Sequence, residues 1–256
     1  MRDKRVLKSA LSAALLAAIA LSPQAMAATQ LIQNGGFEAD GMETTMPLNW
    51  QTFADGIIGS VTTATGPVSP ISGYATAGPY AGSYYGLLDA AFPSNNALIQ
   101  TFSTGGAVTS AVLTFRLFVN DQNPLGASVN NTGLDYTTGG SFAPNQHTRV
   151  DLLRGGASPF DTGAGVVRSM YLQGDGGISS PNPYQKFTFD LTQDLAAGGT
   201  FQLRFANVAN QAALQTGVDN VSLLVAAVPE PSTYALMFAG LGLIGTVVRR
   251  RRNQRD

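Results

Sequence analysis

Carboxylates are the most plentiful side chains in this sequence that could do chemistry. Residues 28–227 carry thirteen Asp and Glu against six Lys and Arg. A glycosidase needs only two carboxylates, about 5–10 Å apart, so a carboxylate-based glycoside hydrolase stays open, although no spacing singles out a pair. The acidic excess argues against nucleic acid as a partner, because binding to its phosphates needs clustered Lys and Arg.

Other catalytic side chains are scarce. The 256-residue chain has no cysteine and one histidine, which excludes thiolate nucleophiles, disulfides, HExxH motifs and three-histidine zinc sites. It also has no G-x-S-x-G elbow for a serine nucleophile. The segment His147-Thr148-Arg149 is typical of the start of a strand, and we expect His147 to lie at the surface or to hydrogen-bond a loop. We therefore expect that the protein is not an enzyme.

Carbohydrate binding needs different side chains, namely flat aromatic rings that stack on sugars and amides or carboxylates that bond hydroxyl groups. Trp50 and Tyr136 lie near predicted loops or strand ends and are the candidate ligand contacts. For Trp50, in the segment Asn49-Trp50-Gln51, packing against a sheet is the competing interpretation.

Short strands must position these side chains. Between Ala28 and Ala227 no segment repeats apolar residues at helical spacing, whereas many short segments alternate with period 2. Loops rich in Gly, Pro, Asn and Ser connect them, which predicts a single all-β antiparallel sandwich. The expected strands are 29–33, 49–53, 57–62, 84–89, 98–103, 112–119, 147–153, 166–172, 187–191, 201–205 and 218–225. The expected core residues are Phe115, Leu117, Phe187, Phe189, Phe201, Leu203 and Phe205.

The N-terminus is typical of a secretory signal peptide. Four Lys or Arg within residues 2–8 precede an apolar run over 10–21, and Ala25-Met26-Ala27 supplies small residues before a cleavage site. We predict that signal peptidase removes residues 1–27 and that the exported domain spans 28–227. A membrane anchor is the alternative, but the run is too short to span about 30 Å of hydrocarbon.

The C-terminus combines three features in a fixed order. Val228-Pro229-Glu230-Pro231 is followed by the uncharged stretch 232–248 and then by Arg249-Arg250-Arg251-Arg252. As a helix, the uncharged stretch would extend for roughly 26 Å, just enough to cross a membrane. We therefore predict a transmembrane helix over 232–248 with the arginines in the cytoplasm, because translocated segments avoid Lys and Arg.

This order resembles the PEP-CTERM sorting signal of exported bacterial proteins, over residues 228–256. The resemblance implies an inner-membrane intermediate, recognition by an exosortase, processing near the Pro-Glu-Pro segment, and delivery to the cell surface or extracellular matrix. The two prolines fix φ and withhold N–H donors, so this segment should be extended and open to an enzyme. An ordinary single-pass anchor is the alternative.

Two short segments of the body resemble the opening and closing strands of jelly-roll domains of the carbohydrate-binding-module and galactose-binding-like kind. They are Asn34-Gly35-Gly36-Phe37-Glu38 and Gly217-Val218-Asp219-Asn220-Val221-Ser222-Leu223. The resemblance implies a jelly-roll sandwich with a structural Ca²⁺ that ties the first and last strands together through Glu38 and Asp219. Two neighbouring carboxylates would repel without a cation, whereas the alternative places both at solvated strand ends.

Three classes of function remain. We favour a non-catalytic protein of the cell surface or extracellular matrix that associates with exopolysaccharide in a biofilm. A specific lectin that resembles a carbohydrate-binding module is the alternative, and a carboxylate-based glycosidase ranks third. The sorting signal supports the first class, the jelly-roll segments support the second, and only the supply of carboxylates supports the third. Fold alone does not establish activity.

Overall fold

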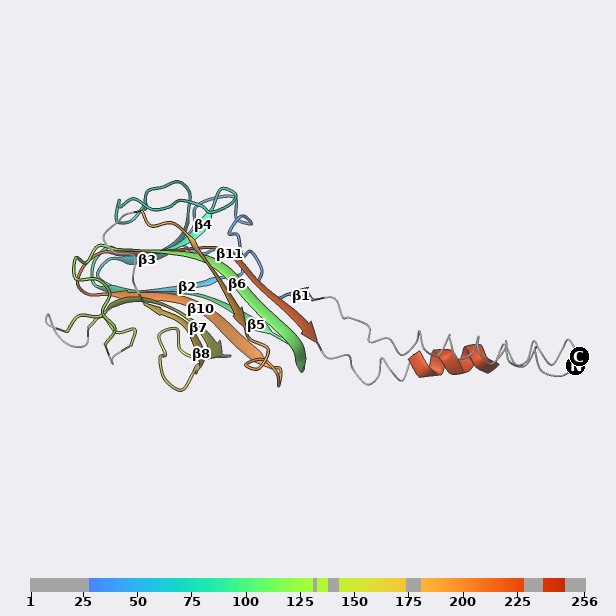
Figure 1. Cartoon of the computed structure of the whole chain (residues 1–256). Helices are drawn as coiled ribbons and strands as arrows, with labels where there is room; N and C mark the ends of the chain where they lie inside the picture. Colours follow the sequence, from blue (N-terminus) through green and yellow to red (C-terminus); the bar gives the residue numbers. More distant parts are fainter. Residues whose placement is uncertain (1–27, 131–132, 138–142, 174–180, 228–236, 247–256) are drawn as a thin grey trace, which may run out of the picture. The chain divides into compact units, whose positions relative to one another are not determined.

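The computed structural model of the chain describes residues 28–130, 133–137, 143–173, 181–227 and 237–246 (Figure 1). Eleven strands run through the described residues, and each overlaps one of the expected strands. In chain order they are β1 (Thr29–Gln30), β2 (Gln51–Gly56), β3 (Gly59–Ala64), β4 (Tyr85–Ala90), β5 (Ser94–Ser103), β6 (Val108–Asp121), β7 (Gln146–Arg154), β8 (Val166–Gln173), β9 (Gln185–Asp190), β10 (Thr200–Ala209) and β11 (Leu214–Ala227).

Two antiparallel sheets form a sandwich (Figure 1). The six-stranded sheet has the order β3-β4-β11-β6-β9, with β1 also beside β11, and the five-stranded sheet has the order β2-β5-β10-β7-β8. The chain crosses repeatedly from one sheet to the other, as it does in a jelly roll. The predicted fold class, an all-β antiparallel sandwich of jelly-roll type, is confirmed.

The main core fills the space between the two sheets. Phe115 of β6 and Phe205 of β10 meet there edge to face, with ring centroids 5.2 Å apart. Burying a side chain of this size stabilises the fold by about 1.5–3 kcal/mol. Of the expected core residues, four are buried and three are half-buried against the same cluster: Phe115, Leu117, Leu203 and Phe205, then Phe187, Phe189 and Phe201.

A second apolar layer covers the outer face of the five-stranded sheet. The alternation of strand residues turns Ala97 and Ile99 of β5, and Ala206 and Val208 of β10, to this face. Leu134, from the connection between β6 and β7, packs on them and completes a separate small cluster. Three half-buried rings lie against this cluster: Phe53, Tyr136 and Phe160.

The two ends of the chain bear on the predictions about export. Residues 28–227 lie in one compact unit. The predicted signal peptide 1–27, the segment 228–236 and the arginines 249–252 lie outside the described residues. Within the predicted membrane span, residues 237–246 are helical. In the part of the chain that the structure describes, no helix is both long and apolar enough to cross a membrane.

Candidate functional site

The two jelly-roll segments of the sequence meet in the fold. The backbone N–H of Val221 donates to the carbonyl of Gly35 at 2.9 Å. A Cβ on Gly35 would lie 1.9 Å from the Val221 carbonyl oxygen, so only glycine allows this approach. Strand β11 is bulged between Asp219 and Ser222, where Asn220 has a positive φ of 49°. Such a bulge re-aims the neighbouring side chain, and Asp219 reaches the loop 80–84.

Asp219 is fully buried and accepts three backbone hydrogen bonds. Its Oδ2 accepts from the N–H groups of Tyr80 and Ala81 at 2.8 and 3.0 Å, and its Oδ1 accepts from the N–H of Asn220 at 2.6 Å. Burial raises the pKa of Asp219 to about 6 against the opposing effect of these N–H groups, and the charge of Glu38 adds to the rise. A solvated strand end, the alternative to a cation site, therefore does not describe Asp219.

Glu38 binds the same loop a few residues further on. Its Oε1 accepts from the N–H groups of Ser83 and Tyr84, both at 2.9 Å, and the side chain is exposed. The structure thus brings Glu38 and Asp219 to one loop, 80–84. Backbone N–H groups face both carboxylates there, so the N–H dipoles of this loop supply part of the positive potential that two carboxylates need.

Trp50 lies in the core, which agrees with the interpretation that its ring packs against a sheet and not with a role in ligand binding. It is 6% exposed, its indole stacks on Phe37 with ring centroids 5.4 Å apart, and Phe205 lies 6.2 Å away. Its Nε1–H donates to the carbonyl of Asn34 at 3.1 Å. Because the ring is covered and its donor is used, the structure gives no support to Trp50 as a ligand contact.

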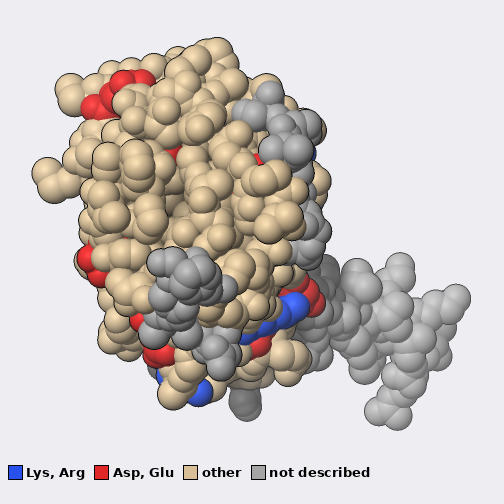
Figure 2. Space-filling model, turned by 90° about the vertical axis from the view of Figure 1, so that its left-hand side faces the viewer, with Lys and Arg blue, Asp and Glu red and all other residues tan. Residues whose placement is uncertain are grey.

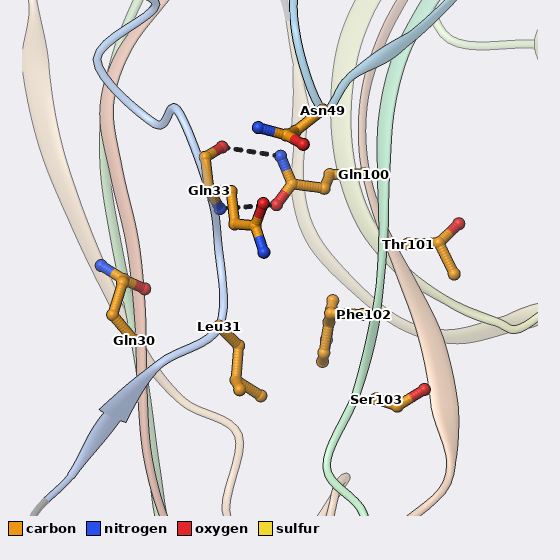
Figure 3. Close-up of a pocket in the computed structure, with 8 residues that line it drawn as sticks. All are labelled: Gln30, Leu31, Gln33, Asn49, Gln100, Thr101, Phe102 and Ser103. Carbon is orange, nitrogen blue, oxygen red and sulfur yellow. Dashed lines mark hydrogen bonds between the residues drawn. The ribbon is translucent and has the colours of Figure 1, made fainter. Parts of the chain in front are cut away.

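A groove without ionisable side chains lies between the chain after β1 and the end of β5, and we call it the neutral groove (Figure 3). Gln100 reaches across it to Gln33, where its Oε1 accepts from the backbone N–H at 2.7 Å and its Nε2 donates to the carbonyl at 2.8 Å. Strand β2 pairs with β5 only as far as Ile99, so the end of β5 is a strand edge here. The groove has a volume of about 370 Å³, and its lining residues are Gln30, Leu31, Gln33, Asn49, Gln100, Thr101, Phe102 and Ser103.

Tyr136 lines a cavity on the outer face of the five-stranded sheet, which we call the Tyr136 cavity. Asp55 of β2 and Asn95 of β5 are cross-strand partners and form its floor. The walls come from the segment 134–137 and from Phe160, in the loop after β7. The cavity has a volume of about 360 Å³, and its lining residues are Asp55, Asn95, Leu134, Asp135, Tyr136, Thr137 and Phe160.

Of the residues that line this cavity, Tyr136 was predicted from the sequence as a ligand contact and the others were not. They come from two strands and two loops, and no spacing along the chain connects them. The one available signal was the alternation in β2, which turns Asp55 to the same side as Phe53. That signal places Asp55 on a sheet face but does not identify the loop that faces it.

The expected surface position of His147 is wrong. Strand β7 does begin beside it, at Gln146, but His147 is completely buried. The backbone of Ser128, in the connection between β6 and β7, favours the protonated ring, although neither ring nitrogen makes a hydrogen bond of good geometry with the described residues. Burial first, and then the charge of Arg149, lowers the pKa of His147 to about 4. The imidazole is therefore neutral near pH 7, and it is not part of the lining of the neutral groove or of the Tyr136 cavity.

Residues 227–252 match the family model of the PEP-CTERM protein-sorting motif. The match confirms the resemblance that rested on Val228-Pro229-Glu230-Pro231 and the arginine block. It implies that the protein is exported, processed by an exosortase and sorted to the cell surface. The match is confined to the sorting segment and assigns no activity to the sandwich.

A comparison with curated proteins finds no match. Among solved structures, the chain is similar to a Stig cyclase from Fischerella sp. TAU, with 16% identity and a TM-score of 0.45 over 78% of this chain and 100% of that one. It is similar to the K3 cleaved adhesin domain of Lys-gingipain from Porphyromonas gingivalis W83, with 14% identity and a TM-score of 0.44 over 77% and 98%. It is also similar to TmCBM61 in complex with β-1,4-galactotriose, with 12% identity and a TM-score of 0.40 over 76% and 97%. TM-scores of this size carry no argument about function.

Proposed function

We propose that the mature protein is a non-catalytic component of the cell surface or extracellular matrix, where exopolysaccharide retains it. The neutral groove carries this proposal. Its amide and hydroxyl groups match the hydroxyl groups of a sugar polymer, Leu31 and Phe102 supply apolar contact, and its lining contains no acid or base.

The rest of the surface is consistent with many weak contacts. Charged residues make up 12% of the sequence. On the face shown in Figure 2 they form a few separate spots on a surface that is mostly uncharged. Such a surface offers little to a polymer of phosphates, while its polar uncharged groups suit hydroxyl-rich chains.

Retention on polysaccharide is the direct test. Residues 28–227 contain every described strand, and we expect this protein to bind exopolysaccharide from the producing cells and to release no reducing sugar. Gln100→Ala, which removes one side of the neutral groove, should weaken retention without abolishing it. Release of reducing sugar that disappears with one Asp→Asn change would establish a glycosidase and overturn the proposal.

A specific lectin is the second candidate, and the Tyr136 cavity is the observation that favours it. The cavity combines an aromatic ring with carboxylates and an amide, the side chains that recognise individual sugars. If one site dominates, Tyr136→Ala should abolish retention, whereas diffuse binding should survive any single change. The same retention assay therefore separates the two candidates.

We also propose that Ca²⁺ binds beside Glu38 and Asp219. Around the position that a Cβ on Gly36 would take, the Oδ1 atoms of Asn220 and Asp219 lie at 3.7 and 4.0 Å and the Cγ of Glu38 lies at 4.0 Å. Carboxylate and amide oxygens are the ligands that Ca²⁺ takes, six to eight at a time. No group of three or more Asp, Glu, His or Cys among the described residues could hold a metal, so Asn220 and backbone carbonyls would have to complete the shell.

Chelation tests the calcium site. An ion that binds only the folded state stabilises it by about 2.7 kcal/mol at a concentration 100 times its dissociation constant. We expect the melting temperature of residues 28–227 to rise with CaCl₂ and to fall with EGTA. Glu38→Gln and Asp219→Asn should each reduce this response. The calcium site is contradicted if EGTA does not change the melting temperature, or if both variants respond to CaCl₂ and EGTA as the unaltered protein does. In that case the loop N–H groups alone balance the two carboxylates.

A further inference from the structure

We propose that the Tyr136 cavity binds one residue of a cationic amino sugar, with its ammonium group at the carboxylates of Asp55 and Asp135 and its ring against Tyr136. The inference rests on the proposed association with exopolysaccharide and deepens its second candidate, a lectin that binds through the Tyr136 cavity. It names the kind of polysaccharide that retains the protein, namely one with free amino groups.

The charge of the lining is the first support. Asp55 and Asp135 are its two charged residues, and both are carboxylates. Asp55 makes no hydrogen bond or ion pair through its side chain within the described residues. The Oδ1 of Asp135 accepts from the backbone N–H and the hydroxyl of Thr137, both at 2.7 Å, which orients this carboxylate. Two carboxylates in one small cavity attract a cation.

The arginines on the same sheet face serve another carboxylate. Arg149 donates to Asp151 from Nε at 2.7 Å and from Nη2 at 2.8 Å, and Arg204 donates to it from Nη2 at 2.6 Å. Arg204 Nη1 also donates to the backbone carbonyls on both sides of Phe160, at 2.8 and 2.7 Å. This cluster fixes the loop that carries Phe160 and directs both guanidinium groups at Asp151.

Asn95 is the second support, because it is a buried polar group that points to a ligand. It is 3% exposed and lines the cavity, yet its side-chain amide has no hydrogen-bond partner among the described residues. Its amide atoms are not among the fully buried ones that lack a partner, so the amide is open to the cavity and available to a ligand. An amide both donates and accepts, so it suits a sugar hydroxyl better than it suits a bare cation.

The aromatic rings and the size of the cavity select the ligand. Tyr136 and Phe160 are half-buried and line the cavity, and an aromatic face attracts both the apolar face of a sugar and a neighbouring ammonium group. A volume of about 360 Å³ is at the lower end for small-ligand pockets, which suits one sugar residue. A metal ion would use the carboxylates but not the rings. A neutral hexose would leave the charge of Asp55 without a counter-charge.

Calorimetric titration tests the inference with two oligosaccharides of equal length. We expect the mature protein, residues 28–227, to bind a glucosamine tetrasaccharide at least tenfold more tightly than an N-acetylglucosamine tetrasaccharide. Asp55→Asn and Tyr136→Ala should each weaken this binding at least tenfold, and Tyr136→Phe should retain it. Asp190→Asn, an exposed carboxylate of β9 in the other sheet, makes the same change of net charge and should have no effect.

Each outcome separates this inference from the proposed function. Equal affinity of the unaltered protein for both oligosaccharides overturns the inference, as does binding that Asp55→Asn and Tyr136→Ala leave unchanged in folded variants. If neither oligosaccharide binds while exopolysaccharide still retains the protein, the inference fails and the proposed function stands. If the glucosamine tetrasaccharide binds but exopolysaccharide does not retain the protein, the cavity assignment holds and the proposed function fails.

Discussion

Two buried ionisable side chains give this sandwich opposite responses to pH. Asp219 has a pKa of about 6 in the folded protein against an ordinary value of 3.8. As pH rises from about 4 to 6, the unfolded chain loses this proton first, so the free energy of unfolding falls. His147 has a pKa of about 4 against an ordinary value of 6.5. Between pH 4 and 6 the unfolded chain therefore holds a proton on this residue that the folded protein lacks. The contribution of His147 to the free energy of unfolding consequently rises with pH.

Asp219→Asn removes the contribution to the free energy of unfolding that falls as pH rises. From pH 4 to 6, we expect the free energy of unfolding of the variant to rise on the order of 2 kcal/mol more than that of the unaltered protein. Urea denaturation in EGTA measures this difference. The other charges near the side chain stay in place: Glu38 binds the same loop, and Arg116, opposite Asp219 on β6, stacks 4.3 Å over the ring of Tyr80. Equal pH slopes would contradict the burial of a titrating Asp219.

His147→Leu removes the contribution to the free energy of unfolding that rises with pH. From pH 4 to 6, the free energy of unfolding of this variant should rise less, or fall more, than that of the unaltered protein, because the variant lacks the contribution of His147. At pH 7 the variant should be at least as stable as the unaltered protein, since leucine replaces a buried ring whose nitrogens make no hydrogen bond of good geometry with the described residues. The same urea series measures both effects. A variant with an unchanged slope would show that His147 stays accessible to protons in the folded state.

Asp151 joins two strands and a loop, and its removal tests that junction. Arg204 of β10 lies opposite Asp151 of β7, and both Arg204 and Arg149 bind its carboxylate in the interior. Asp151→Asn leaves two guanidinium groups without their counter-charge, so the free energy of unfolding should fall by about 3–5 kcal/mol. Urea denaturation at pH 7 measures the loss.

A partly exposed ion pair provides the matched control. Arg168 and Asp194 pair at 2.9 Å, with side chains that are 39% and 21% exposed. Solvent screens such a pair, so Asp194→Asn should lower the free energy of unfolding by less than about 1 kcal/mol. If the two Asp→Asn variants lose the same stability, burial does not determine the strength of the Asp151 junction.

The strands were predictable from the sequence, and the sites only in part. Alternation reflects the period of a strand backbone, so the inward faces of β9 and β10 are visible without knowledge of their partners. Glu38 and Asp219 were identified because each lies in a local motif. Asp55 and Asn95 come from separate segments, and only the pairing of β2 with β5 joins them. The burial of His147 likewise depends on the segments that cover the outer face of the five-stranded sheet. The alternation of residues along β7 does not show that this face is covered.

Strand β11 links the fold to the export route. It is paired with β1, β4 and β6 and ends at Ala227, and the match to the sorting motif begins at residue 227. The segment that an exosortase must bind therefore follows the sheet with no spacer. Prolines at positions 229 and 231 favour an extended chain there. Cleavage after Ala227 would remove the tail and leave every strand of the sandwich intact.

Processing at this junction can be measured on the intact protein. We expect the surface form to begin at Ala28 and to lack the arginines 249–252, and intact-mass spectrometry of protein recovered from an exosortase-containing host measures both ends. A host without the exosortase should keep the tail on the protein. Deleting residues 249–252 should leave the sandwich folded, since β11 ends at Ala227, yet prevent delivery to the surface. A surface form whose mass includes Asp256 would contradict the processing route while leaving the fold and both binding sites unaffected.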